Sequence, residues 1–289
     1  MVLKTPKQKK ISKFTNEKTS YTKHNLIVGN CLDVLSDKKI IKNESVDLIV
    51  TSPPYGLFKK YGKYSDAFNI DSWTEMMKSF AEKSMRILKP NGSIFLNISP
   101  IPEPKTKEIF PLDTFAYLAF KESGYFLRNK IIWHFNNMQN CSNRLSGRWE
   151  TILWFVKDIK NYKFNLDDVR LPYITKKDKR LTGTGRNPTD VWYFDRVNNM
   201  TKNKLNLNHP TVYPDPLIER ILKMSTDKQD VVLDPFLGSG TTMKVSKNLE
   251  RNSIGIEIDP QYEKLVKQRI NEDHVNTKFK LTVTHHDKK

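Results

Sequence analysis

The sequence predicts an α/β fold with a mostly parallel sheet. Short apolar runs that suit buried strands alternate with stretches of helical periodicity, which is typical of parallel strands linked by crossover helices. Two of the apolar runs lead directly into loops rich in proline or glycine, where such sheets place their ligands. The length of 289 residues suits one large domain, or one domain that carries an insertion.

The expected elements follow from the apolar runs and their flanking residues. The first strand is expected at residues 25–28 and the second at 47–50. Asp71 or Ser72 is expected to cap a helix that ends at 89–92, because the Lys-Pro-Asn-Gly sequence there stops helices. Further strands are expected at 93–98, 131–133, 152–156, 231–233 and 255–258, with a helix at 112–122.

Composition divides the chain into a core and less regular parts. The alternation fades into a polar segment at 158–207, which predicts a functional insertion or a disordered loop. The polar, basic start of the chain predicts a disordered arm. The expected division is an arm at 1–22, the first part of the core at 23–157, the insertion at 158–207, the second part of the core at 208–275 and a basic tail at 276–289.

The chain is strongly basic, with 49 Lys and Arg against 32 Asp and Glu and a formal net charge of +17. This excess favours a polyanionic partner such as nucleic acid, although surface lysines that serve solubility alone would give the same composition. Cys31 and Cys141 have no second Cys or His at ligand spacing, so we expect neither a disulfide nor a metal site. No apolar stretch approaches the ~20 residues of a membrane span, so we expect a cytoplasmic protein with no membrane partner.

The first motif lies at residues 232–242, where an apolar strand leads into a glycine-rich turn and the start of a helix. Glycines let a ligand approach the backbone, and Glu257 at the end of the next strand can bind both hydroxyls of a ribose. The Gly-x-Gly-x-x-Gly pattern of dinucleotide folds and the Gly-Lys-Thr or Gly-Lys-Ser of triphosphate loops are both absent. The motif indicates a nucleoside site, with an ordinary turn capped by Thr241 as the alternative.

The second motif is the sequence Ser-Pro-Pro-Tyr at residues 52–55, directly after a buried strand. The exocyclic amine of a base is a poor nucleophile because its lone pair is delocalised into the ring. A serine hydroxyl and a backbone carbonyl that accept its two N–H groups would hold the nitrogen toward tetrahedral geometry, and Tyr55 would stack on an extruded base. A stiff Pro-Pro turn with a buried tyrosine is the alternative for this motif taken alone.

The two motifs on one predicted sheet, with residues 88–93 between them, resemble the β-class amino-methyltransferases of bacterial restriction-modification systems. The resemblance covers about residues 25–270. It implies a Rossmann-like class I methyltransferase fold with a circularly permuted motif order, in which the catalytic motif precedes the cofactor motif. It also implies that the insertion at 158–207 is a target-recognition segment that acts on double-stranded DNA.

The resemblance assigns roles to the residues of both motifs. It implies S-adenosylmethionine (S-adenosyl-L-methionine) as the cofactor, with Glu257 on the ribose hydroxyls and the adenine toward Asp33, for which helix capping is the alternative. The catalytic residues would be Ser52, Pro53, Pro54 and Tyr55, and the residues around the methionine part would be Asp234, Phe236, Gly238, Ser239, Gly240, Thr241 and Thr242.

Two further segments are similar to parts of the same family. Residues 209–214 resemble the segment that closes the cofactor pocket. Residues 148–150, Arg-Trp-Glu, resemble a segment that flanks the base pocket, although burial of Trp149 in the core would explain its presence equally well.

The serine at position 52 bears on the target base. Members of the family with serine before Pro-Pro-Tyr typically act on N4 of cytosine and those with aspartate on N6 of adenine, so cytosine is expected and adenine is the alternative. A DNA-binding module without catalysis is an alternative from another class, whereas the missing third glycine argues against a nicotinamide-dependent oxidoreductase. The resemblance allows for a cognate restriction endonuclease that acts on the same site, and it leaves the oligomeric state open.

Overall fold

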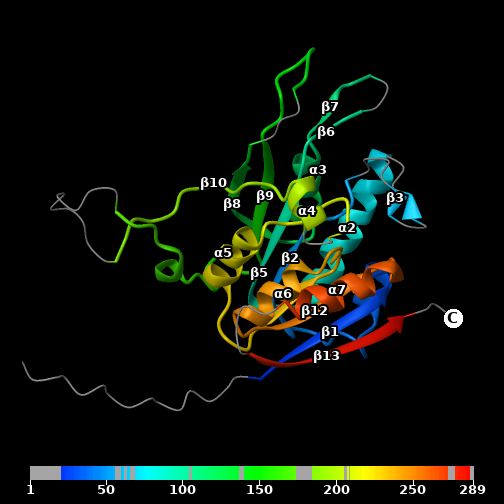
Figure 1. Ribbon diagram of the computed structural model, residues 1–289, viewed down its shortest axis with the longest axis vertical. Helices are drawn as coiled ribbons and strands as arrows, with labels where there is room; N and C mark the ends of the chain where they lie inside the picture. The colour runs from blue at the N-terminus through cyan, green and yellow to red at the C-terminus, as the bar shows by residue number, and fades with distance from the viewer. Residues whose placement is uncertain are drawn as a thin grey trace, which may run out of the picture.

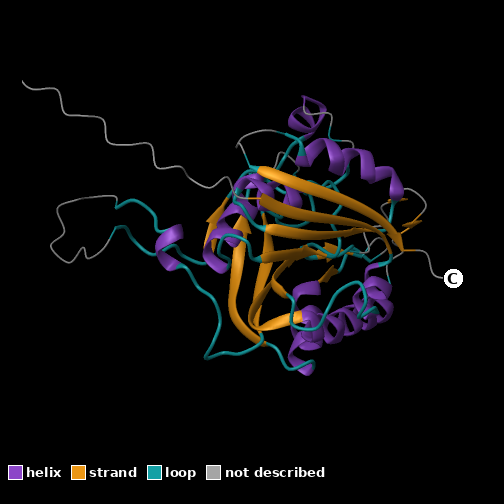
Figure 2. Ribbon diagram, turned by 90° about the horizontal axis from the view of Figure 1, so that it is seen from below, coloured by secondary structure: helices purple, strands orange, loops and turns teal. Residues whose placement is uncertain are grey.

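A single nine-stranded sheet with helices on both faces organises the computed structural model (Figure 1, Figure 2). The described residues are 21–55, 60–61, 64–65, 69–103, 106–136, 140–173, 184–204, 207, 209–272 and 277–286. The strands lie in the order β10-β8-β9-β5-β2-β11-β12-β1-β13. Their bounds are β1 Tyr21–Gly29, β2 Val46–Thr51, β5 Leu88–Ile98, β8 Phe126–His134, β9 Trp149–Val156, β10 Val191–Tyr193, β11 Val231–Asp234, β12 Asn252–Glu257 and β13 Lys278–His286.

The helices cover the sheet in two layers, as Figure 2 shows. Helices α1, α2 and α3 contribute to one apolar cluster, whereas α5 and α6 contribute to a second on the other face and α6 and α7 to a third. The helix bounds are α1 Cys31–Ser36, α2 Ile70–Ile87, α3 Leu112–Glu122, α4 Asn199–Lys204, α5 Asp215–Ser225, α6 Thr241–Asn248 and α7 Glu263–Ile270. Short elements complete the fold: 3-10 turns Leu166–Val169 and Pro260–Tyr262, and the hairpins of β3 Lys60–Tyr61 with β4 Tyr64–Ser65 and of β6 Ile101–Pro102 with β7 Ile109–Phe110.

The central strands are apolar on both sides because helices cover both faces of the sheet. Strand β2 is buried at all six positions, and its side chains alternate between the two layers: Ile49 belongs to the first cluster and Leu48 to the second. Strand β9 runs antiparallel to its neighbours β5 and β8, while the other described pairs of this sheet are parallel. The predicted α/β fold is confirmed.

Two expectations about the segment from 69 to 98 are wrong. The cap of α2 is Asn69, whose side chain accepts the backbone N–H of Ser72 at 3.0 Å, so Asp71 and Ser72 lie inside the first turn. Residues 89–92 do not separate helix from strand, because β5 already begins at Leu88. The pairing of β5 with β2 is irregular between Val46 and Leu48, and such irregularities accommodate a proline that has no N–H to donate.

The expected basic tail at 276–289 contains a strand. β13 pairs with β1 along its whole length, from Tyr21 opposite Lys278 to Gly29 opposite His286. Its apolar side chains Phe279, Leu281 and Val283 pack against a core cluster, while the alternate residues are mostly polar. Pairing with β13 also explains why β1 begins at Tyr21 rather than at residue 25; residues 1–20 of the expected arm lie outside the described part of the chain.

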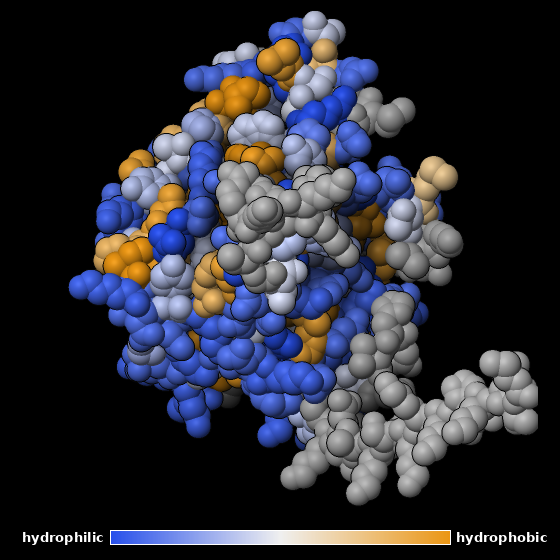
Figure 3. Space-filling view, turned by 90° about the vertical axis from the view of Figure 1, so that its left-hand side faces the viewer, coloured by the Kyte–Doolittle hydropathy of each residue, from blue (hydrophilic) through white to orange (hydrophobic). Residues whose placement is uncertain are grey.

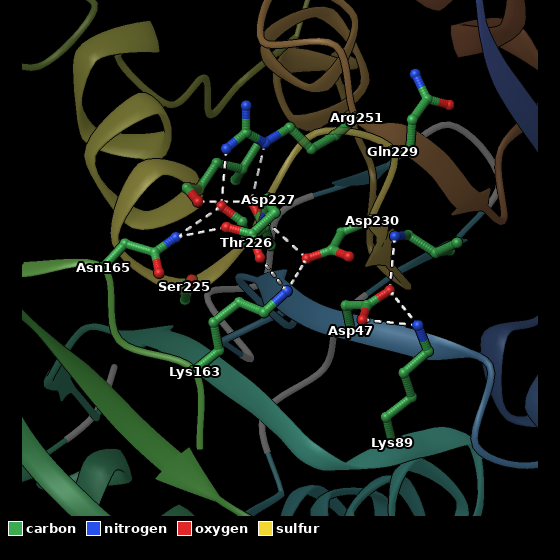
Figure 4. A network of polar contacts seen from close by, with 12 residues as sticks. Asp47, Lys89, Lys163, Asn165, Ser225, Thr226, Asp227, Gln229, Asp230 and Arg251 are labelled. Carbon is green, nitrogen blue, oxygen red and sulfur yellow. Dashed lines mark hydrogen bonds and ion pairs between the residues drawn. The ribbon is translucent and has the colours of Figure 1, made fainter. Parts of the chain in front are cut away.

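The insertion at 158–207 is attached to the core at both of its ends. Near its start, Lys163 forms ion pairs with Asp227 and Asp230, which Figure 4 shows together with the neighbouring Asn165. Near its end, β10 adds to the sheet beside β8, and Trp192 is buried. The side of the molecule on which the insertion projects is mostly hydrophilic with scattered apolar patches (Figure 3). No helix among the described residues combines the length and apolar character needed to span a membrane.

Candidate functional site

A cavity of about 1740 Å³ lies at the edge of the sheet where β2, β11 and β12 end. Strands β2 and β11 are neighbours, but the helices that follow them, α2 and α6, lie on opposite faces of the sheet, and ligands bind at such switch points. The structure brings both predicted motifs to this cavity. The expected site residues that line it are Ser52, Pro53, Pro54, Tyr55, Phe236, Gly238, Ser239, Thr241 and Glu257.

Asp234 lies beneath this lining and joins the two motifs. Its carboxylate accepts the hydroxyl of Thr51, the last residue of β2, at 2.6 Å and that of Thr242 on α6 at 2.6 Å. It also accepts the backbone N–H of Phe236 at 3.2 Å. Burial raises the pKa of Asp234 to about 6. The aspartate therefore fixes the glycine-rich loop to the end of β2.

Glu257 ends β12 and is also buried, with 8% of its surface exposed. One carboxylate oxygen accepts the backbone N–H of Gly238 at 2.7 Å, and the other accepts that of Asp259 at 2.9 Å. Burial raises the pKa of Glu257 to about 7. The side chain thus lies directly against the glycine-rich loop, and both of its oxygens also accept backbone N–H groups.

The glycines of this loop are required by its geometry. Gly238 and Gly240 have φ values of 54° and 84°, which strain other residues. A Cβ at Gly238 would lie 2.9 Å from ring atoms of His209, so the segment at 209–214 covers the loop closely. The His209 ring packs edge-on against Tyr262 at 4.5 Å between centroids.

The residues after β1 are placed differently from the expectation. Gly29, Asn30, Cys31 and Leu32 line the cavity, whereas Asp33 is not among its lining residues and lies in the first turn of α1. The cap of that helix is Asn30, whose side chain accepts the N–H of Leu32 at 2.9 Å, so Asp33 is not the cap either. Gly240, Thr242 and Asp234 likewise lie outside the lining.

The Ser-Pro-Pro-Tyr loop is held by contacts on both of its sides. The indole N–H of Trp73 on α2 donates to the carbonyl of Pro54 at 2.7 Å. The Ser52 hydroxyl donates to the Tyr55 hydroxyl at 2.6 Å. Tyr55 itself is buried, and burial is the main reason that its pKa lies well above the ordinary value. The loop is therefore rigid, with Ser52 at its accessible end.

The cavity also contains polar residues that the sequence motifs did not single out as catalytic. Asn97 is the last residue but one of β5, Glu150 is the second residue of β9, and Tyr213 follows the insertion. The Tyr213 side chain is buried close to Ser52 and Asn97, and burial raises its pKa well above the ordinary value. A polar residue at the end of an apolar strand is the sequence signal for Asn97. Trp149 is 39% exposed, so burial in the core does not explain it.

Known proteins resemble the chain in sequence and in fold. The profile of the N6/N4 methylase family, described as DNA methylase, matches residues 46–268. Type II methyltransferase M.BglII of Bacillus subtilis is 39% identical over 244 residues, which cover 81% of this chain and 65% of that protein. The chain therefore spans slightly less than two thirds of the length of that relative.

A second relative and a solved structure extend the comparison. The DNA adenine methyltransferase YhdJ of Escherichia coli (strain K12) is 31% identical over 253 residues, with 82% of this chain and 80% of that protein covered. The structure of PvuII DNA methyltransferase (cytosine-N4-specific) superposes with a TM-score of 0.71 at 21% identity and covers 91% of this chain and 92% of that one. At this identity the superposition shows the fold, and it agrees with the predicted Rossmann-like core.

Proposed function

The chain belongs to the N6/N4 family of DNA methylases, and from this premise we propose that it transfers a methyl group from S-adenosylmethionine to an exocyclic amine of a base in double-stranded DNA. Membership of this family fits a restriction-modification system. The observation that carries the proposal is that the Ser-Pro-Pro-Tyr loop and the glycine-rich loop line one cavity, with Asp234 bonded to both β2 and α6. A cavity of about 1740 Å³ has room for a nucleoside cofactor and a base.

The residues around the glycine-rich loop fit the cofactor. Glu257 offers a buried carboxylate for ribose hydroxyls, and Gly238 and Ser239 of the glycine-rich loop line the same cavity. Asp234 and Glu257 are buried carboxylates, which suits a cofactor that carries a sulfonium cation. When bound, S-adenosylmethionine supplies an electrophilic methyl group.

The catalytic loop acts by positioning the amine. The indole N–H of Trp73 already donates to the carbonyl of Pro54. The proposed acceptors of the two amine N–H groups are therefore the carbonyl of Pro53 and the hydroxyl oxygen of Ser52. Holding the nitrogen by both hydrogens favours tetrahedral geometry and directs its lone pair toward the methyl donor. The proposed stacking partner of the extruded base is the face of Tyr55, which lines the cavity.

The proposed target is N4 of cytosine, with N6 of adenine as the second candidate. Ser52 before Pro-Pro-Tyr supports cytosine, and the PvuII enzyme, cytosine-N4-specific by its description, shares the fold. The relative YhdJ, described as an adenine methyltransferase, supports the second candidate. Mass spectrometry of nucleosides from DNA of a host that expresses the protein distinguishes N4-methylcytosine from N6-methyladenine, and sequencing of the modified bases gives their context.

Replacement of Ser52 tests the proposal. We expect Ser52→Ala to reduce transfer of tritiated methyl groups to DNA by roughly 100-fold or more, because the amine loses one of its two acceptors. Ser45→Ala is the matched control: Ser45 precedes β2 at its opposite end and donates to the carbonyl of Lys42. Equal activity of the two variants would sink the assignment. Failure of the wild-type chain to bind S-adenosylmethionine in calorimetry would favour a DNA-binding module without catalysis.

A further inference from the structure

A hydrogen-bonded chain within the cavity wall joins Ser52 through Tyr55 to the carboxylate of Glu150. The Ser52 hydroxyl donates to Tyr55 at 2.6 Å, and the Tyr55 hydroxyl lies 3.3 Å from one oxygen of Glu150. Asn97 joins the chain from the side, because its amide donates to the Tyr55 oxygen at 2.8 Å and to Glu150 at 2.6 Å. Glu150 is only 5% exposed.

The sheet topology creates this arrangement. Strand β9 is antiparallel to β5, so its first residues lie at the same edge as the last residues of β5, with Thr151 opposite Ile98. Glu150, which precedes Thr151, therefore reaches the end of β5 and the loop after β2. Its second oxygen faces the guanidinium of Arg196, from the insertion, at 3.3 Å.

The groups around Tyr55 favour one direction for the hydrogen bonds of the chain. The Tyr55 oxygen receives an amide hydrogen from Asn97. The Tyr55 hydroxyl can donate its one hydrogen to the backbone carbonyl of Asn97 at 3.0 Å or to the carboxylate of Glu150 at 3.3 Å. When Tyr55 donates to one of these acceptors, its oxygen accepts the hydrogen of Ser52, and the Ser52 hydrogen points toward Tyr55.

This direction matters for an amine substrate. A hydroxyl has one hydrogen, and a serine that points it into the cavity would meet the N–H groups of the amine with its own donor. With its hydrogen bonded to Tyr55, the Ser52 oxygen presents lone pairs to the cavity. A carboxylate at the end of the chain secures the direction because it accepts hydrogen bonds and cannot donate them.

We infer that Glu150 is a positioning residue for methyl transfer: through Tyr55 it holds the Ser52 hydroxyl as an acceptor for the target amine. The inference rests on the proposed function, in which Ser52 accepts an amine N–H. In this role Glu150 does not contact the base, whereas a residue that recognises the base would bind it directly.

A double-mutant cycle in single-turnover methyl transfer tests the inference. Glu150→Gln keeps the size of the side chain, but its amide can donate to Tyr55 and so allow the chain to reverse. We expect the rate to fall roughly 10- to 100-fold, with the affinities for S-adenosylmethionine and DNA unchanged within about twofold. In a Tyr55→Phe background, where the chain is already interrupted, Glu150→Gln should lower the rate no further.

Other results overturn the inference. Additive losses in the double mutant would mean that Glu150 acts without Tyr55, as a direct contact with the base or a general structural role would require. A wild-type rate in Glu150→Gln would exclude any role. Glu150→Asp keeps the carboxylate, so its rate of methyl transfer should be at least about tenfold higher than that of Glu150→Gln. If Glu150→Gln does not fold, Tyr55→Phe provides the test. The folded Tyr55→Phe variant should show a lower rate of methyl transfer with unchanged affinities for S-adenosylmethionine and DNA. A wild-type rate in this variant would refute the inference. Absence of methyl transfer by the wild-type chain would instead refute the proposed function.

Discussion

The acidic side chains at the two edges of the central sheet have different partners. At the amino edge, where β2 begins, Asp47 pairs with Lys89 at 2.7 Å and accepts the backbone N–H of Val231 at 2.9 Å. The neighbouring Asp227 pairs with Lys163 at 2.8 Å (Figure 4). At the carboxyl edge, Asp234 and Glu257 accept only hydroxyl and backbone N–H groups, and no ion pair to either is found among the described residues.

The difference separates charges that serve the fold from charges that serve a ligand. An ion pair with Lys163 contributes to a lowered pKa of Asp227, so this carboxylate is favourable in the folded protein. Burial raises the pKa of Asp234 and of Glu257 to about 6 and about 7, so their negative charges oppose folding. A cationic cofactor would relieve that cost. We therefore expect substitutions at the carboxyl edge to reduce function and those at the amino edge to reduce stability.

The largest effect is expected for Asp234→Asn. The amide keeps the shape of the side chain but removes the buried negative charge that holds Thr51 and Thr242. The raised pKa of Asp234 means that the cost of burying the charge outweighs these hydrogen bonds, so the loss should appear in the alignment of the two loops and in cofactor binding, and methyl transfer should fall by roughly 100-fold or more. Calorimetry with S-adenosylmethionine and tritium transfer to DNA measure the two consequences. A melting temperature that falls together with the activity would contradict the comparison, because this charge is not expected to stabilise the fold.

A smaller effect is expected from pH, through Glu257. Its pKa of about 7 means that the carboxylate becomes protonated as the pH falls below neutrality. A neutral acid is a weaker acceptor for ribose hydroxyls, so the dissociation constant of S-adenosylmethionine should rise roughly tenfold between pH 8 and pH 6. Calorimetry across this range measures the effect. Glu257→Gln should bind weakly at every pH, and an unchanged pH dependence in this variant would assign the titration to another group.

The same pKa shift predicts the opposite trend for stability without cofactor. The folded-state pKa of Glu257 lies above its ordinary value of 4.5, so the folded protein binds more protons between about pH 4.5 and pH 7. The contribution of this group to the free energy of unfolding therefore increases as the pH falls from 7 toward 4.5. Asp227, with a lowered pKa, contributes stability above 3.8 that is lost as the pH falls through its folded-state pKa.

The sequence predicted the central strands and the two loops because their signals are local. The apolar run at 47–50 predicts a strand that is buried on both faces. The candidate site residues in the loops after β2 and β11 are consecutive in the chain, so short motifs identify them. β13 was missed because lysines alternate with its apolar residues, and such a pattern becomes a strand only when β1 offers an edge to pair with.

The parts of the site that sequence reasoning missed depend on contacts between strands that are distant in the sequence. The resemblance placed residues 148–150 beside the base pocket, but the contact of Glu150 with Tyr55 could not be predicted, because it results from the antiparallel register of β9 against β5. The part of the cavity beside β1 shows the same limit. Asn30 and Asp33 both follow β1, but Asn30 lines the cavity and Asp33 does not. The direction in which α1 leaves the strand determines this difference.

A further prediction concerns the loop at the carboxyl edge. Trp73→Phe removes the indole N–H that holds the carbonyl of Pro54, so the catalytic loop becomes freer to move. We expect the rate of methyl transfer to fall about fivefold, the equivalent of one neutral hydrogen bond. Trp154→Phe is the matched control, since Trp154 is equally buried and donates to Ser93 away from the cavity. Similar activity losses in both variants would indicate a general effect of removing a buried indole.

The smallest effect on activity is expected for Asp47→Asn, the counterpart of Asp234→Asn on the neighbouring strand. Asp47 is buried, and its carboxylate joins Lys89 of β5 to the first backbone N–H of β11. Its loss should lower the free energy of unfolding by about 1–2 kcal/mol, because Lys89 is partly exposed and water replaces part of the interaction. Urea denaturation measures this change, and methyl transfer should stay within about twofold of wild type. An activity loss as large as that of Asp234→Asn would show that both edges of the sheet control the site, since the two variants remove the same charge at opposite ends of adjacent strands.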